Sequence, residues 1–144
     1  MAGSRYPGRA SATDAVFTFP YAMPADFINS ASLSTATSIT VWTPGTNNKF
    51  RLMGVHIALS GGAIQTTAGD ILMSLMDGGT AGTTILSQHV YVPAAASGAN
   101  IVLVNVRFNG GYLSSAENNV LTLMLGSAMT GGYVSCVAWG LEEG

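Results

Sequence analysis

From about residue 37 onward, short apolar runs alternate with clusters of glycine, asparagine, proline and aspartate. These clusters favour turns, and they are spaced too closely for a long helix. Seven strands are predicted between them, at Thr37–Thr43, Phe50–Ser60, Ile71–Asp77, Thr84–Val92, Ile101–Phe108, Asn119–Gly126 and Gly132–Gly140. Short strands at near-regular spacing indicate an all-β sandwich or barrel.

Several predicted strands are apolar on both faces. Ser74 is the only polar residue in Ile71–Met76, and His56 alone interrupts the apolar run Met53–Leu59. A sandwich needs only one inward face per strand. The second apolar face is therefore predicted to be covered by another subunit or by the N-terminal segment.

Charged residues make up only 8% of the chain, against about 25% in ordinary domains. Strand edges then lack the Lys and Glu that usually prevent association. The composition therefore predicts self-association or a place in a larger shell. The alternative is a monomer whose surface is Ser, Thr, Gly and Asn.

Residues 1–36 differ in composition and are predicted to form an extended N-terminal arm, with the β-sandwich domain over 37–144. Pro20 and Pro24 disfavour helix in this segment. Fully extended, the arm reaches roughly 120 Å, farther than one small domain is wide. Its aromatic residues are predicted to anchor it on a neighbour, namely Phe17, Phe19, Tyr21 and Phe27.

Most chemical functions are disfavoured by the composition. Five basic residues are too few for phosphate-driven nucleic-acid binding, and no apolar run is long enough for a membrane helix. No Gly-x-Ser-x-Gly, P-loop or dinucleotide fingerprint occurs, so no enzymatic activity is predicted. His56 and His89 lack partners at ligand spacing and are interpreted as interior or interface residues, so no metal or cofactor is expected.

Two smaller features have competing interpretations. Asp77 opens an Asp-Gly-Gly segment, which favours a hairpin turn over a calcium loop because the alternating acidic ligands are missing. The single cysteine, Cys136, is interpreted as a small packed residue. Trp139 is interpreted as a core residue. Trp42, Tyr91 and Tyr112 are interpreted either as core and interface anchors or as a platform for stacking sugars.

Several segments resemble small virion proteins of tailed bacteriophages, and the nearest group is the capsid decoration, or cement, proteins. The resemblance spans roughly residues 37–143. The segments that carry it are Val41-Trp42-Thr43-Pro44, Lys49-Phe50-Arg51-Leu52-Met53-Gly54, Asn109-Gly110-Gly111-Tyr112-Leu113, Asn118-Asn119-Val120-Leu121 and Val137-Ala138-Trp139-Gly140 with its acidic tail.

The resemblance implies a jelly-roll-like β-sandwich that forms a homotrimer on the outer capsid surface, after synthesis in the host cytoplasm. The expected partner is the major capsid protein, and the expected role is to bridge capsomers and stabilise the shell. Arg5, Arg9, Arg51 and Arg107 are expected to supply polar contacts. The alternative is a phage tail or fibre module that binds surface glycans through Trp42, Tyr91 and Tyr112.

Overall fold

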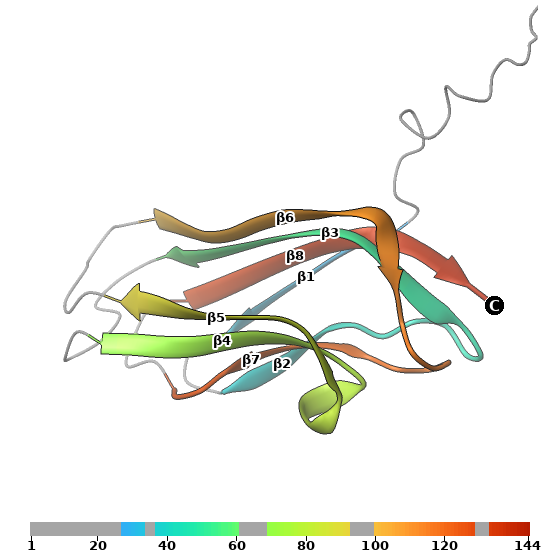
Figure 1. Cartoon of the computed structure of the whole chain (residues 1–144), viewed down its shortest axis with the longest axis horizontal. Helices are drawn as coiled ribbons and strands as arrows, with labels where there is room; N and C mark the ends of the chain where they lie inside the picture. The colour runs from blue at the N-terminus through green and yellow to red at the C-terminus, as the bar shows by residue number, and fades with distance from the viewer. Residues whose placement is uncertain (1–26, 34–36, 61–68, 93–99, 129–132) are drawn as a thin grey trace, which may run out of the picture.

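The computed structural model describes residues 27–33, 37–60, 69–92, 100–128 and 133–144, which form two packed four-stranded antiparallel sheets (Figure 1). The prediction of an all-β sandwich is confirmed. The strands are β1 (Phe27–Leu33), β2 (Ser38–Trp42), β3 (Lys49–Ser60), β4 (Gly69–Asp77), β5 (Thr83–Val92), β6 (Asn100–Leu113), β7 (Leu121–Leu125) and β8 (Tyr133–Glu143), with a 3₁₀ turn η1 (Gly79–Ala81) after β4.

The strand pairing is nested along the chain. Sheet I has the order β1-β8-β3-β6, and sheet II has the order β2-β7-β4-β5. The first strand therefore pairs with the last, β2 with β7, β3 with β6 and β4 with β5. Within the described residues, no helix has the length and apolar character needed to cross a membrane.

The core forms where alternate residues of the two sheets face each other. β3 contributes Phe50, Leu52, Val55, Ile57 and Leu59, all completely buried. From sheet II, the inward residues of β7 are also buried: Leu121, Leu123 and Leu125. Burying one such side chain contributes about 1.5–3 kcal/mol, so these two strands are a large part of the folding free energy.

Cys136 lies on the inward side of β8 and is fully buried, as predicted. Burial raises the pKa of its thiol to about 12. The thiol therefore stays protonated at neutral pH, and Cys136 acts as a small apolar residue of the core.

The end of the predicted arm belongs to the sandwich. Phe27–Leu33 forms β1, which pairs with β8 without interruption and makes one edge of sheet I. The ring of Phe27 lies against the ring of Trp42, with 5.9 Å between their centres. The predicted boundary between arm and sandwich, at residue 36, was therefore too late. The sequence of this segment does not indicate a strand, and the segment becomes one because it pairs with β8.

Two predicted strand ends are also corrected. The segment Asn109-Gly110-Gly111 was predicted to break the chain, but β6 continues through it to Leu113. The register moves from Arg107 opposite Gly54 to Tyr112 opposite Leu52, so the glycines lie in a bulge. Gly110 and Gly111 have φ values of 84° and 80°, which glycine adopts without strain. The last strand, predicted to stop at Gly140, extends to Glu143.

Trp139 is not a core residue. Ala138 and Gly140 are the inward residues of β8 at this point, and Trp139 lies between them on the outer side, half-buried. Its ring covers Gly54 of β3, where a Cβ atom would lie only 2.3 Å from Trp139 Cζ2. Gly54 therefore makes room for the indole on the outside of sheet I.

Candidate functional site

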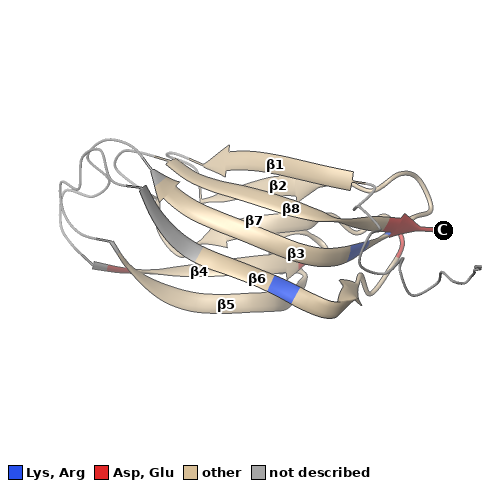
Figure 2. Ribbon diagram, turned by 90° about the horizontal axis from the view of Figure 1, so that it is seen from above, with Lys and Arg blue, Asp and Glu red and all other residues tan. Residues whose placement is uncertain are grey.

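The charged side chains gather toward the end of the sandwich where β8 finishes. Figure 2 shows this concentration near the C-terminus, with blue on β6 set apart from it and red at the opposite end, on β4. Lys49 and Arg51 on β3 lie opposite Glu143 and Leu141 of β8. Three hydrogen-bonded networks occupy this end, and the question is whether any of them leaves a group free to bind or react.

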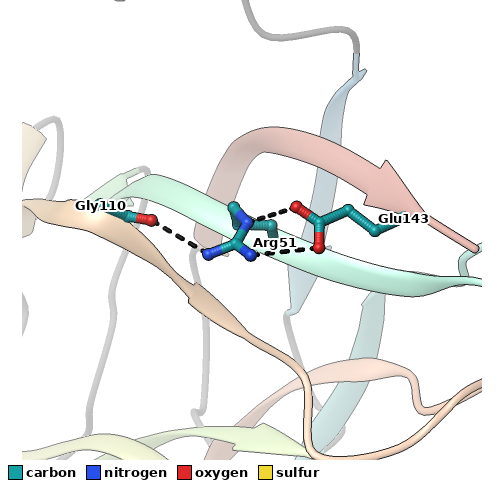
Figure 3. A network of polar contacts seen from close by, with 3 residues as sticks. All are labelled: Arg51, Gly110 and Glu143. Carbon is teal, nitrogen blue, oxygen red and sulfur yellow. Dashed lines mark hydrogen bonds and ion pairs between the residues drawn. The ribbon is translucent and has the colours of Figure 1, made fainter.

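In the first network, Arg51 donates to both carboxylate oxygens of Glu143 and to the backbone oxygen of Gly110 (Figure 3). The Arg51 hydrogen bond lowers the pKa of Glu143, and the same bond raises the pKa of Arg51. Arg51 was expected to make a polar contact with a partner. The structure instead shows it joining β3 to β8 and to the glycine bulge of β6.

The second network is centred on Glu142 and holds the loop after β2. Glu142 accepts hydrogen bonds from the Trp42 indole at 3.3 Å, the Gly45 amide at 2.6 Å and the Asn48 side chain at 3.0 Å. Burial opposes ionisation of Glu142, but these hydrogen bonds outweigh it and lower its pKa. The carboxylate therefore fastens the loop to the last strand.

The third network surrounds Asp77, whose side chain is 1% exposed. Its carboxylate accepts hydrogen bonds from Tyr112 Oη at 3.0 Å, Ser114 Oγ at 2.9 Å, the Ser115 amide at 2.7 Å and Asn119 Nδ2 at 2.9 Å. Burial disfavours the charged form of Asp77 and so raises its pKa. The hydrogen bonds from Ser115, Ser114 and Asn119 outweigh this effect, and the net result is a lowered pKa of Asp77. Burial and the bond to Asp77 raise the pKa of Tyr112 to about 12.

The Asp77 cluster is built to hold the chain together. It joins the end of β4 to the end of β6 and to the segment before β7, and all four donors are neutral. The hairpin that Asp77 was predicted to open is present, with Gly78 at φ 98° before η1. No group of three or more His, Cys, Asp or Glu residues that could bind a metal ion occurs in the described ranges.

The two histidines lie on the outer sides of different sheets, so neither is an interior residue, and the interpretation as interface residues stays a prediction. His56 is half-buried on β3, opposite Val137 and Asn105. His89 is exposed on β5, opposite Leu72.

The three aromatic residues proposed as a sugar platform do not share a surface. Trp42 is 2% exposed and packs against Phe50, with ring centres 5.7 Å apart. Tyr112 is half-buried, packs on the other side against Phe50 and donates its hydroxyl to Asp77. Tyr91 is 64% exposed, but it lies on β5 opposite Asp70, in the other sheet from Tyr112. Trp42 and Tyr112 are thus core anchors.

Among the described residues, the outer face of sheet I carries exposed apolar side chains between polar ones. One row across the sheet contains Ile28, Trp139, Gly54 and Arg107 on four neighbouring strands. The next row contains Ser30, Val137, His56 and Asn105. Ile28 is 72% exposed and Tyr133, at the start of β8, is 55% exposed. Arg107 is exposed on this face.

The predicted interaction residues are only partly placed on this face. Phe27 lies at its edge but turns inward against Trp42, and Arg107 lies on it. Five others fall outside the described residues: Arg5, Arg9, Phe17, Phe19 and Tyr21. Sequence analysis missed Ile28 and Val137. The signal for Val137 was available, because the odd and even positions of β8 are both largely apolar.

Comparison with known proteins adds no relative to this picture. The chain matches no model of a protein family and no curated protein.

Proposed function

We propose that the chain is a structural virion protein that decorates the capsid of a tailed bacteriophage and stabilises it by bridging capsomers. The observation that carries the proposal is the outer face of sheet I, where Ile28, Val137 and Trp139 form an apolar surface next to Arg107. Monomeric proteins rarely leave such a surface uncovered. The nested strand pairing supports a jelly-roll assignment, because it is the order that two linked Greek keys produce.

The polar networks also support a structural role, because their carboxylates are already hydrogen-bonded within the fold. Asp77, Glu142 and Glu143 each have their carboxylates occupied by donors from within the fold. They tie strands and loops together at one end of the sandwich. Because these carboxylates bind donors of the same chain, they stabilise the sandwich itself. The remaining exposed surface is available for contact with other proteins.

The proposed mechanism is mass action. A protein that binds the assembled shell and not its separate subunits stabilises the shell by RT ln(1 + [L]/Kd), or about 2.7 kcal/mol at one hundred times Kd. Because the contact surface is mainly apolar, attachment should change little when salt shortens the screening length. The major capsid protein is the proposed partner.

The test uses a phage strain from which the gene for this chain is deleted. Its capsids should break at lower temperature than wild-type capsids, and adding the purified full-length chain should restore the difference. Binding is measured by co-sedimentation and by occupancy in electron cryomicroscopy images. Capsids of unchanged stability that bind none of the added chain would refute the proposal.

A glycan array distinguishes the tail or fibre alternative, in which specific sugar binding replaces capsid binding. The arm is tested separately by deleting residues 1–26. A longer deletion, to residue 30, would remove part of β1 and so test folding as well as binding. The shorter deletion should leave the sandwich folded and reduce capsid occupancy.

A further inference from the structure

The two long sides of the sandwich are closed to different degrees. On one side, β1 lies beside β2, and the inward residues Leu33, Val41 and Trp42 are buried. On the other side, the edge strands β5 and β6 make no comparable contact within the described parts of the chain. The inward apolar residues there are only half-buried, although they pack against the core: Leu86, Val90, Val106 and Phe108.

β5 is the edge strand best suited to add another strand. It is ten residues long, with no charged residue, proline or glycine between Thr83 and Val92. Its register with β4 is regular from Leu86 to Val92. β2 has five residues and an irregular register, and β6 carries Arg107 and two register shifts. β1 is also uncharged, but it is shorter and its flank lies beside β2.

We propose that β5 pairs antiparallel with β5 of a second copy of this chain, about a two-fold axis through Gln88. This register places Leu86 opposite the partner's Val90 on the inner side. On the outer side it places Ser87 opposite the partner's His89. A register centred on His89 would instead place Gln88 opposite the partner's Val90, and so set an amide against an apolar side chain.

Pairing between two β5 strands would stabilise this side of the sandwich in two ways. It gives the backbone groups on the outer edge of β5 a ladder of hydrogen bonds, which an edge with no charged residue, and with no bulge from Leu86 to Val92, invites. It also brings further apolar surface next to the half-buried Leu86 and Val90, and so removes more of that surface from water. The two copies of sheet II then form one continuous eight-stranded sheet.

The first test measures the mass of the full-length chain in solution by light scattering. We expect twice the 14.7 kDa of one chain. A monomer at high concentration, or the homotrimer that the resemblance to decoration proteins implies, overturns the proposal, because an isologous pair closes at two.

The second test is a disulfide cross-link in Gln88→Cys under mild oxidation. Residues directly opposite each other in an antiparallel ladder have Cα atoms about 4.5–5.5 Å apart, which a disulfide can span. Cys136 is buried and does not compete. The matched control is Ser30→Cys, which places a thiol on the exposed side of β1, an edge strand of sheet I. Equal or faster cross-linking of the control overturns the proposal.

The third test places a charge on the inner side of the edge with Val90→Lys, which should weaken the pair at least tenfold. The control is Ser32→Lys on β1, where the dimer should persist. An unchanged mass for a folded Val90→Lys variant refutes the pairing. If circular dichroism shows that this variant does not fold, the Gln88→Cys cross-link decides. Capsid binding is a separate measurement, so the pairing and the virion role can fail independently.

Discussion

The cluster around Asp77 and the outer face of sheet I differ in whether their side chains find partners within the chain. In the cluster, a buried carboxylate has four hydrogen-bond donors supplied by the chain itself. On the face, Ile28 and Tyr133 present apolar surface to water. Half of the Asp, Glu, Lys and Arg residues that the structure describes are thus used within the fold, namely Arg51, Asp77, Glu142 and Glu143, whereas the outer face of sheet I offers apolar side chains to other molecules. Stability and binding should therefore respond to different substitutions.

The largest expected effect is on stability, from Asp77→Ala. The change removes the acceptor that four donors share, one of them buried and the others partly buried, and each buried group left unsatisfied costs about 1–3 kcal/mol. We expect the free energy of unfolding to fall by about 3 kcal/mol or more, measured by urea denaturation. Asp77→Asn should also destabilise the protein. The side-chain NH₂ group of Asn is a hydrogen-bond donor, and it would replace a carboxylate oxygen that accepts hydrogen bonds from other donors.

Asp70→Ala is the matched control, since Asp70 is an exposed acid near the other end of the same strand. Its effect should stay within about 0.5 kcal/mol. Equal effects of the two substitutions would mean that the Asp77 cluster contributes no more than an exposed carboxylate does, and the comparison would break down.

The largest effect on binding is expected from Ile28→Asp. The residue is exposed on an edge strand, so the charge remains hydrated in the free protein, but it must be buried when the outer face of sheet I is covered. Capsid attachment should weaken at least tenfold, which is about 1.4 kcal/mol, while the unfolding midpoint stays close to wild type. Co-sedimentation and thermal unfolding measure the two effects separately.

Leu72→Asp is the control for that substitution. Leu72 is also exposed and aliphatic, at 40%, but it lies on the outer face of sheet II beside His89. Its replacement should leave capsid attachment unchanged. If both variants lose attachment equally, the outer face of sheet I has no special role.

The sequence was sufficient for the sheet-forming segments because glycine, asparagine and proline mark the turns between them. It was insufficient where pairing decides the outcome. Phe27–Leu33 contains two serines and an asparagine and becomes a strand only through its partner β8. Asn109-Gly110-Gly111 has the composition of a hairpin turn, and the same conformational freedom also suits the bulge that it forms.

The candidate site was harder to predict than the fold. Along β8, Val134, Cys136 and Ala138 face inward, while Tyr133, Val137 and Trp139 face outward. Both sets are apolar, so alternation alone does not choose the inward side. The partners of Asp77 lie 35 to 42 residues away in the chain, and nothing local to Asp77 indicates them. That the protein has a second apolar face was predictable, but which residues form it was not.

Acid should affect the polar end before it affects the outer face. The pKa values of Asp77, Glu142 and Glu143 are lowered in the folded protein. Such groups contribute stability that is fully present above their ordinary pKa values of 3.8 and 4.5 and is lost as pH falls through their lowered values. These three carboxylates should therefore add no slope to stability between pH 6 and 8 and a loss below about pH 4.5.

Thermal unfolding across this pH range measures the effect. Glu142→Gln should reduce the acid-dependent loss, because one of the three carboxylates no longer titrates. A variant with an unchanged acid profile would show that Glu142 does not contribute to it.

The smallest effect is expected from Glu143→Gln. Glu143 forms a bidentate pair with Arg51, but both side chains are partly exposed, at 39% and 28%. Water and salt screen such a pair, and its two-residue coupling is usually about 0.2–1 kcal/mol. A double-mutant cycle with Arg51→Gln measures that coupling, which should shrink as salt is added. Glu117→Gln, in the exposed segment before β7, is the control for removing one negative charge. If the Arg51–Glu143 coupling equalled the loss from Asp77→Ala, a solvent-facing pair would matter as much as the buried cluster, and burial would not be what separates the two regions.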